Sequence, residues 1–197
     1  MSVSKRVVVL ILWLGLATAF PSAQDQTQSK GQSSQTPATP STSPAAKATD
    51  VASPEAILAA NYEVISGPVG QRDWDRFRSL YLPDARLGSV RHAKDGADLT
   101  THSFTLEQFV AFGDAYFKKD GFFEKEISRH ADRYSNIMQV FSTYESRHDP
   151  IDSKPFARGI NSFQLFFDGN RWWIASVFWQ GESPDAPIPE QFLPKTH

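Results

Sequence analysis

The chain has 197 residues, no cysteine, and 20 Lys and Arg against 22 Asp and Glu. This length allows one ordinary domain with extensions, and without cysteine we expect no disulfide, no thiol chemistry and no lipoprotein anchor. A weakly acidic chain with no basic run is a poor candidate for nucleic-acid binding, because nucleic acid is held largely by Lys and Arg contacts to phosphate.

Residues 1–23 have the pattern of a secretory signal peptide. A basic start is followed by a weakly polar to apolar run over residues 7–20, and small residues offer cleavage after Ala19 or Ala23. An uncleaved anchor is the alternative, but a transmembrane helix needs about 20 apolar residues and this run is shorter. We therefore expect an exported protein, periplasmic or secreted, with no stable membrane anchor after cleavage and a mature charge of about −4.

Two segments that flank the folded domain have compositions that oppose regular structure. Residues 24–50 contain no aromatic residue and no Val, Ile, Leu or Met, so burial could not offset the entropy of ordering them, and we expect a disordered Ser/Thr/Gln/Pro linker. Residues 182–197 carry four prolines, which oppose a central strand or a helix, so we expect a tail that lies extended over the domain or a partner chain. The folded domain should therefore span residues 51–181.

Two helices are predicted at the start of this domain. The first begins after Ser53, a typical N-cap that precedes a proline, and ends at Gly67. The second is shorter and begins at Trp74. We expect a strand over residues 85–90 and then a polar loop over residues 91–103.

The third predicted helix has the best-defined start. Thr105 and Gln108 match a capping box, in which each side chain accepts a hydrogen bond from the other residue's backbone amide. Phe104 and Phe109 are spaced for a hydrophobic staple, and Asp120-Gly121 should close the helix.

Residues 124–180 are predicted to form four strands. Asp168-Gly169 between two aromatic-rich runs is a strong hairpin signal, and Ser135-Asn136 marks an earlier turn. Asn161 shares a face with Phe163, because residues two apart in a strand point the same way, and we expect that face to be covered. Helices grouped before a run of strands predict an α+β layer fold. The last strand is apolar on both faces, and the faces of the strand around Tyr144 could not be assigned from the pattern.

Four segments carry a family resemblance: AILAANYEVISG, DWDRFRSLYLPDARL, STYESR and RGINSFQLFFDGNRWWI. With the closing pattern of Asp168-Gly169, Trp172 and Ile174, the chain resembles the nuclear transport factor 2-like superfamily, and within it the SnoaL-like proteins, over residues 53–180. The resemblance implies an α+β cone, in which a strongly curved antiparallel sheet wraps around three helices and leaves a pocket at the open end. It also implies pairing of two chains through the outer face of the sheet. Such pairing would explain why the last strand is apolar on its outer face, and a C-terminal tail packed on that face would explain it equally well.

The resemblance leaves the activity open, because fold does not determine function. The superfamily includes ketosteroid isomerases, polyketide cyclases, dehydratases, epoxide hydrolases and pocketed proteins without known activity. Its catalytic members place an acid or a His–Asp pair inside the cone, and no such set matches this chain residue by residue.

Three residues are candidates for acid–base chemistry. His130 and Asp132 lie two apart on one strand face, where they form either a catalytic pair or an ordinary exposed pair. Glu145 is either a base in the cone mouth, with its pKa raised by surrounding rings, or half of an ion pair with Arg147. The histidines are not spaced as metal ligands, and no phosphate-binding loop or nucleophile motif is present, so we expect neither a metal nor a cofactor.

A pocket lined with rings and a few polar groups is predicted inside the cone. Asn161 is its polar candidate, with a satisfied core amide as the alternative. The expected pocket residues are Tyr62, Trp74, Tyr81, Tyr116, Tyr144, Asn161 and Trp179.

Three functions remain open at this point. The preferred one is an exported homodimer that binds an apolar or amphipathic small molecule without catalysis. The second is a cofactor-independent isomerase, dehydratase or hydrolase that uses Glu145 or Asp132, with Tyr144, His130 or Asn161 orienting the substrate. The third is a protein-interaction module that works through the outer face of the sheet.

Overall fold

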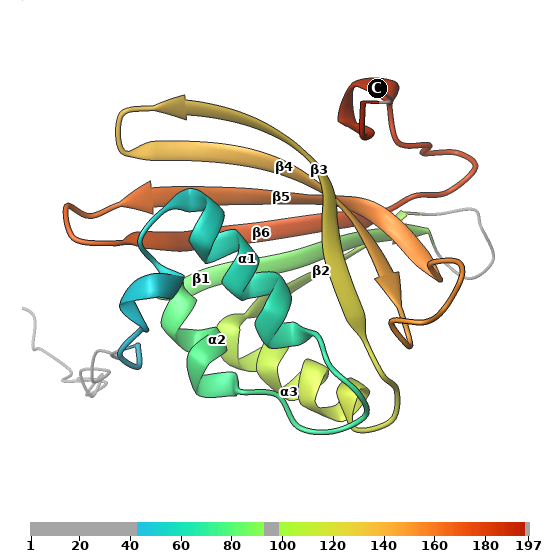
Figure 1. Ribbon diagram of the computed structural model, residues 1–197, viewed down its shortest axis with the longest axis horizontal. Helices are drawn as coiled ribbons and strands as arrows, with labels where there is room; N and C mark the ends of the chain where they lie inside the picture. The colour runs from blue at the N-terminus through green and yellow to red at the C-terminus, as the bar shows by residue number, and fades with distance from the viewer. Residues whose placement is uncertain (1–42, 93–98, 196–197) are drawn as a thin grey trace, which may run out of the picture. The chain divides into compact units, whose positions relative to one another are not determined.

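The computed structural model describes residues 43–92 and 99–195 (Figure 1). The predicted signal peptide and residues 24–42 of the predicted linker lie outside the described residues. No helix in the described ranges is both long and apolar enough to cross a membrane.

The folded domain begins before residue 51. Ala48–Asp50 form a short 3-10 helix, and the Asp50 carboxylate pairs with Arg76 at 2.7 Å. The Ser43 hydroxyl donates to the backbone carbonyl of Tyr81 at 3.0 Å. The expected disorder of the linker is therefore wrong for residues 43–50, because Asp50 has a cationic partner on the domain.

The three predicted helices are present: α1 Pro54–Ile65, α2 Trp74–Leu80 and α3 Leu106–Phe117. The Ser53 hydroxyl caps α1 by accepting from the Ala56 amide at 3.1 Å. Both hydrogen bonds of the predicted Thr105–Gln108 capping box form, at 3.2 and 2.9 Å.

Six strands form one open sheet in the order β2-β1-β6-β5-β4-β3. Their bounds are β1 Tyr81–His92, β2 Leu99–Thr105, β3 Phe123–Tyr134, β4 Ile137–Arg147, β5 Ala157–Phe167 and β6 Trp172–Gly181. Both predicted turns join strands, since β3 and β4 meet across Ser135-Asn136 and β5 and β6 meet across Asp168-Gly169.

Two expectations about the sheet need correction. The sheet is mixed rather than wholly antiparallel, because β1 and β6 run parallel. These two strands are far apart in the chain, so no hairpin forces them to reverse direction. The expected loop over residues 91–103 is wrong as well, since β1 continues to His92 and Leu99–Thr105 pair with it. The exposed polar strand β2 lacks the apolar alternation that marks a half-buried strand.

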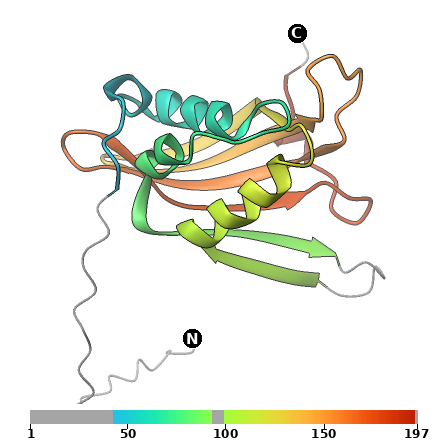
Figure 2. The same cartoon turned by 90° about the horizontal axis from the view of Figure 1, so that it is seen from below.

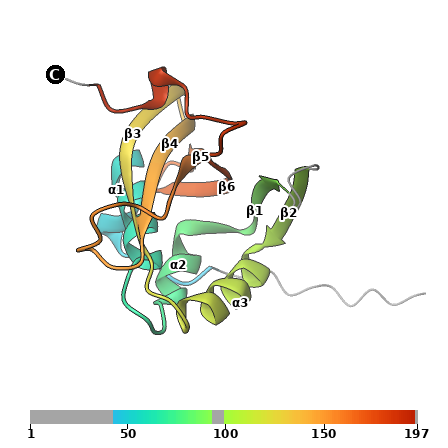
Figure 3. The same ribbon diagram turned by 90° about the vertical axis from the view of Figure 1, so that its right-hand side faces the viewer.

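The helices lie on the concave face of the bent sheet, as Figures 2 and 3 show. The predicted α+β fold with three helices is therefore confirmed. On β4 the inward face carries Val140, Ser142 and Tyr144, all buried, which assigns the strand whose faces the pattern left open. The core forms between this face and the helices.

The C-terminal tail lies on the outer side of β3 and β4, as far as residue 195. The Phe192 ring packs against Phe141 with ring centroids 5.4 Å apart, and the Thr143 hydroxyl donates to the Phe192 carbonyl at 2.6 Å. Phe178 on β6 remains 45% exposed. The tail therefore covers one part of the outer face and leaves the apolar side chain of β6 accessible.

Candidate functional site

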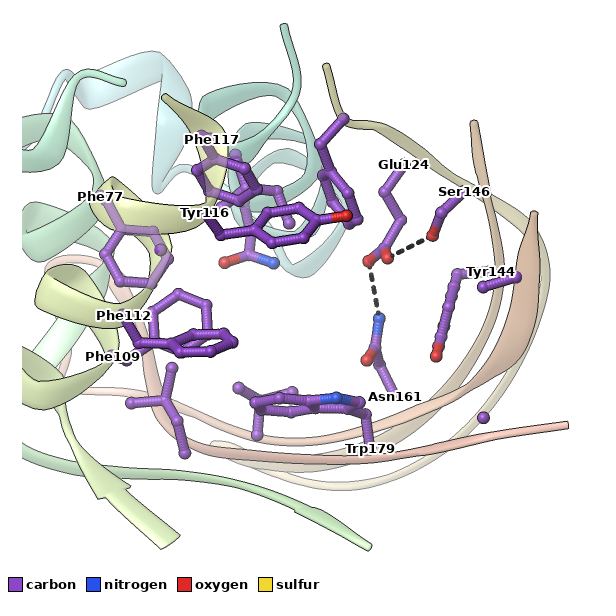
Figure 4. Close-up of a pocket in the computed structure, with 18 of the residues that line it drawn as sticks. Phe77, Phe109, Phe112, Tyr116, Phe117, Glu124, Tyr144, Ser146, Asn161 and Trp179 are labelled. Carbon is purple, nitrogen blue, oxygen red and sulfur yellow. Dashed lines mark hydrogen bonds between the residues drawn. The ribbon is translucent and has the colours of Figure 1, made fainter. Parts of the chain in front are cut away.

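A cavity of about 660 Å³ lies between the helices and the concave face of the sheet. Aromatic rings from α2 and α3 form much of its helix-side wall (Figure 4), contributed by Phe77, Phe109, Phe112, Tyr116 and Phe117. Asn61, Ile65 and Gly113 also line this side, and Phe122 lines the cavity between α3 and β3. Apolar walls of this kind exclude water and favour an apolar ligand.

Strand residues supply most of the polar part of the wall. Glu124, Tyr144, Ser146 and Asn161 line the cavity together with Trp179 (Figure 4). They come from β3, β4, β5 and β6, which are neighbours in the sheet, so residues far apart in the sequence meet at one end of the cavity.

Glu124 is held in place by the end of α1. Its backbone amide donates to the Ser66 hydroxyl at 3.0 Å. The single hydrogen of that hydroxyl is shared between the Tyr62 carbonyl at 2.7 Å and the Glu124 carbonyl at 3.2 Å, which fixes the start of β3 against the last turn of the helix. The Glu124 side chain is thereby directed into the cavity.

The Glu124 carboxyl group accepts two hydrogen bonds. The Ser146 hydroxyl donates to Oε2 at 2.8 Å, and the Asn161 amide donates to Oε1 at 3.3 Å. Burial disfavours the ionised form and raises the pKa of Glu124 to about 7, although both hydrogen bonds act in the opposite direction. The carboxyl can therefore either donate or accept a proton near neutral pH.

A chain of hydrogen bonds runs from Asn161 to an ion pair at the edge of the sheet. The Asn161 amide donates to the Tyr62 hydroxyl at 3.0 Å, and that hydroxyl lies 2.6 Å from the Ser142 hydroxyl. Ser142 donates in turn to Glu126, whose carboxylate pairs with Arg129 at 2.9 Å. The Asn161 side chain is thus anchored from outside the cavity.

Tyr144 lies against β5 because residue 159 is a glycine. A Cβ at Gly159 would lie 2.6 Å from the Tyr144 hydroxyl oxygen, which is closer than any packed contact allows. Burial raises the pKa of Tyr144, which keeps the hydroxyl protonated, although the positive charge of Arg91 acts in the opposite direction. Within the described part of the chain the Tyr144 hydroxyl has no hydrogen-bond partner, so it can bond to a ligand.

Five of the seven expected pocket residues line the cavity: Tyr81, Tyr116, Tyr144, Asn161 and Trp179. The other two are corrections. Tyr62 lies behind Asn161, with its hydroxyl in the hydrogen-bond chain. Trp74 packs beneath α3, stacked on Phe117 with ring centroids 5.9 Å apart, because its helical stripe faces another helix.

The three expected acid–base candidates lie outside the cavity. Glu145 faces outward and pairs with Arg147 at 2.7 Å and with Lys125 at 3.0 Å. Arg147 lowers the pKa of Glu145, with a smaller contribution from Lys125, so the expectation of a raised pKa is wrong. The side chains of His130 and Asp132 are 59% and 83% exposed, so they form the ordinary surface pair.

Glu124 was missed because its face depends on the strand register. It pairs opposite Ser146, and the irregularity between Glu126 and Ser128 breaks the alternation of β3. The available signal was its position directly after two phenylalanines at the start of a polar strand, but without the register that position is also typical of a surface acid.

No protein-family model and no curated protein matches the chain. Solved structures do. A nuclear transport factor 2-like protein of unknown function from Pseudomonas putida aligns with a TM-score of 0.50 at 9% identity, over 72% of this chain and 89% of that one. The chain has the nuclear transport factor 2-like fold.

Two further solved structures also align with the chain. A protein from Thiobacillus denitrificans, described as a candidate calcium/calmodulin-dependent protein kinase type II association domain, aligns with a TM-score of 0.52 at 12% identity, over 66% of this chain and 96% of that one. A candidate ketosteroid isomerase from Parabacteroides distasonis aligns with a TM-score of only 0.43 at 17% identity, over 66% and 89%. At such identities the nuclear transport factor 2-like fold is shared, and the functions of these proteins do not transfer.

Proposed function

We propose that this chain is an exported protein that binds a small, largely apolar molecule in its ring-lined cavity. The observation that supports this function is the cavity of about 660 Å³, in which Glu124 is the one acid among the described lining residues. Ligand pockets typically enclose about 300–1,000 Å³ and combine apolar walls with a few polar groups.

The cavity wall offers a ligand two kinds of contact. The rings of Phe109, Phe112 and Trp179 supply apolar area, worth about 25 cal/mol for each Å² removed from water. Glu124 and Tyr144 supply the directional contacts that orient the ligand. We expect the polar end of the ligand to lie against β3 and β4.

Export and pairing of two copies belong to the same proposal. The signal-peptide pattern of residues 1–23 supports export to the periplasm or the exterior. The 45% exposed Phe178 on the outer face of β6 supports pairing through that face.

A neutral fluorescent probe, N-phenyl-1-naphthylamine, tests the proposal. Val177 is buried, lines the cavity and can be changed to Trp to fill it, whereas Gln164→Trp on the exposed outer face of β5 is the matched control. We expect one probe per chain, at least about tenfold weaker binding in V177W by analogy with other overfilled sites, and no change in Q164W. Equal binding by a folded V177W protein would overturn the proposal.

Proton transfer at carbon is a second candidate function. The pKa of Glu124, about 7, supports it, because a general base is most effective when its pKa lies near the working pH. Deuterium exchange into 2-tetralone, followed by NMR, tests this function. E124Q should abolish any catalysed exchange and the outward-facing E145Q should retain it, whereas exchange at the uncatalysed rate with the wild-type protein would exclude it for this class of ketone.

A further inference from the structure

At the polar end of the cavity, the donors of Asn161 and Ser146 are already used within the wall. Asn161 has two amide hydrogens, and one is donated to Tyr62 and the other to Glu124. The Ser146 hydroxyl hydrogen is also donated to Glu124. What this group leaves for a ligand is the free lone pairs of the Glu124 carboxylate and the amide oxygen of Asn161. The Tyr144 hydroxyl also lines the cavity and can either donate or accept.

The orientation of the Asn161 amide follows from the ion pair at the far end of the hydrogen-bond chain. Because Glu126 is paired with Arg129, its carboxylate accepts, and the Ser142 hydroxyl must donate to it. Ser142 has one hydrogen, so Tyr62 must donate to Ser142 and must accept from Asn161. The nitrogen of Asn161 therefore faces Tyr62 and Glu124, which leaves its oxygen for the cavity (Figure 4).

The Glu124 carboxylate also lacks a cationic partner among the described residues. Its interactions are burial and two neutral hydrogen bonds. Arg91 is the one cation among the described lining residues, and its charge acts on Tyr144. An ionised Glu124 would therefore take its counter-charge from the molecule in the cavity.

We propose that the ligand is a lipophilic amine, whose protonated nitrogen donates to the Glu124 carboxylate and to the Asn161 oxygen while its apolar body fills the ring-lined part. This assignment rests on the proposed function and specifies its ligand class. An ammonium group offers up to three donors and no acceptor, which complements this set of acceptors. The rings of Tyr144 and Trp179 lie beside the same position (Figure 4) and add attraction for a cation.

The affinity for such an amine should depend on pH through Glu124. Since the pKa of Glu124 is about 7, the ionised fraction rises about tenfold between pH 6 and pH 8. An amine with a pKa of about 10 stays protonated over this range, so its binding should tighten by about tenfold and should release a proton near pH 7.

Burial raises the pKa of the tyrosines on the facing elements, so they stay neutral in this range: Tyr62, Tyr81, Tyr116 and Tyr144. Glu126 pairs with Arg129 at 2.9 Å, and Arg91 is the one cation among the described lining residues.

Calorimetry with three ligands that share one apolar body tests the proposal on the wild-type protein. The ligands are 2-(1-naphthyl)ethylamine, 2-(1-naphthyl)ethanol and 1-naphthylacetate. At pH 8 we expect the amine to bind at least about tenfold more tightly than the alcohol, consistent with a charge-assisted contact, and the acid to bind most weakly. Binding of the alcohol as tightly as the amine would overturn the amine assignment and leave the proposed function standing. Failure of all three ligands and of the neutral fluorescent probe to bind would overturn the proposed function itself.

Two variants distinguish the contribution of the ion pair to amine binding from general effects of mutation on the cavity. E124Q keeps the size of the side chain and removes its charge, so the amine should lose its advantage while the alcohol keeps its affinity within about threefold. Glu190→Gln, at an exposed position of the tail, is the matched control and should keep the tenfold preference. The release of a proton on amine binding, measured in buffers of different ionisation heat, needs no variant. Its absence near pH 7 would contradict the proposal.

Discussion

The Asn161 amide nitrogen lies 3.3 Å from the Glu124 carboxylate and joins a half-buried acid on β3 to the inner face of β5. The same nitrogen donates to Tyr62 on α1, so one side chain connects the helix, the sheet and the carboxyl of the cavity. The pKa of Glu124 and the orientation of Asn161 are therefore coupled.

Replacing Asn161 by Leu should raise the pKa of Glu124 further. The substitution removes a donor that favours the ionised form, and we expect a rise of roughly one unit. Titration of carbon-13-labelled glutamate by NMR measures this directly. Gln164→Leu, on the outer face of the same strand, should leave the titration unchanged, and an unchanged or lowered value in N161L would contradict the coupling.

The stability of the protein should fall as pH rises from about 5 to 8. Folding raises the pKa of Glu124 from its usual 4.5 to about 7, so between these values the folded state holds a proton that the unfolded state has lost. The cost of ionising the buried carboxyl is absent below this window and complete above it, on the order of 3 kcal/mol. Urea unfolding at pH 5 and pH 8 measures the difference. E124Q should remove this loss of stability between pH 5 and pH 8. An equal loss in E124Q and in the wild type would show that other titrating groups cause it.

Gly159→Ala should damage both stability and the cavity. The added Cβ would lie 2.3 Å from the Gln180 carbonyl oxygen and 2.6 Å from the Tyr144 hydroxyl, so the backbone or the ring must move. We expect a loss of about 1–3 kcal/mol, as for other overpacked sites, together with weaker probe binding. At Gly181 the nearest atom to an added Cβ is 3.8 Å away, so Gly181→Ala is the control. A fully stable G159A protein would show that Tyr144 is not confined by β5.

Phe178→Glu should separate a dimer that pairs through the outer face of the sheet. Phe178 is 45% exposed on this face, and burying a charge in an apolar interface is costly. Light scattering after size-exclusion chromatography should show a dimer for the wild type and a monomer for F178E. Tyr134→Glu changes a side chain that is 80% exposed and should leave the dimer intact. A wild-type monomer at high concentration would exclude the pairing.

The elements of this fold whose signals are local were predictable from the sequence. Ser53, the capping box at Thr105 and the Asp168-Gly169 turn act through neighbouring backbone groups, and the structure confirms each of them. Strand β2 was missed because its two large apolar residues, Leu99 and Phe104, lie on opposite faces and the rest is polar, so its pairing with β1 leaves no apolar alternation. The parallel pairing of β1 with β6 depends on the whole topology and has no local signature.

The candidate site was predictable only in part, for a related reason. Asn161 could be placed because clear alternation marked the inner face of its strand. Trp179 was expected in the pocket as a large ring, although its strand is apolar on both faces. Glu145 was placed wrongly and Glu124 was overlooked because the faces of β3 and β4 depend on a register that contains an irregularity. The burial that raises the pKa of Glu124 depends on the tertiary fold, which no local pattern reveals.

Native mass spectrometry of the exported protein with N-phenyl-1-naphthylamine tests the central claim most directly, because it counts bound molecules on each chain. We expect one probe molecule per chain for the wild type, none for V177W and one for Q164W. Equal occupancy of the wild type and a folded V177W protein would contradict the claim that the ring-lined cavity around Glu124 is the binding site.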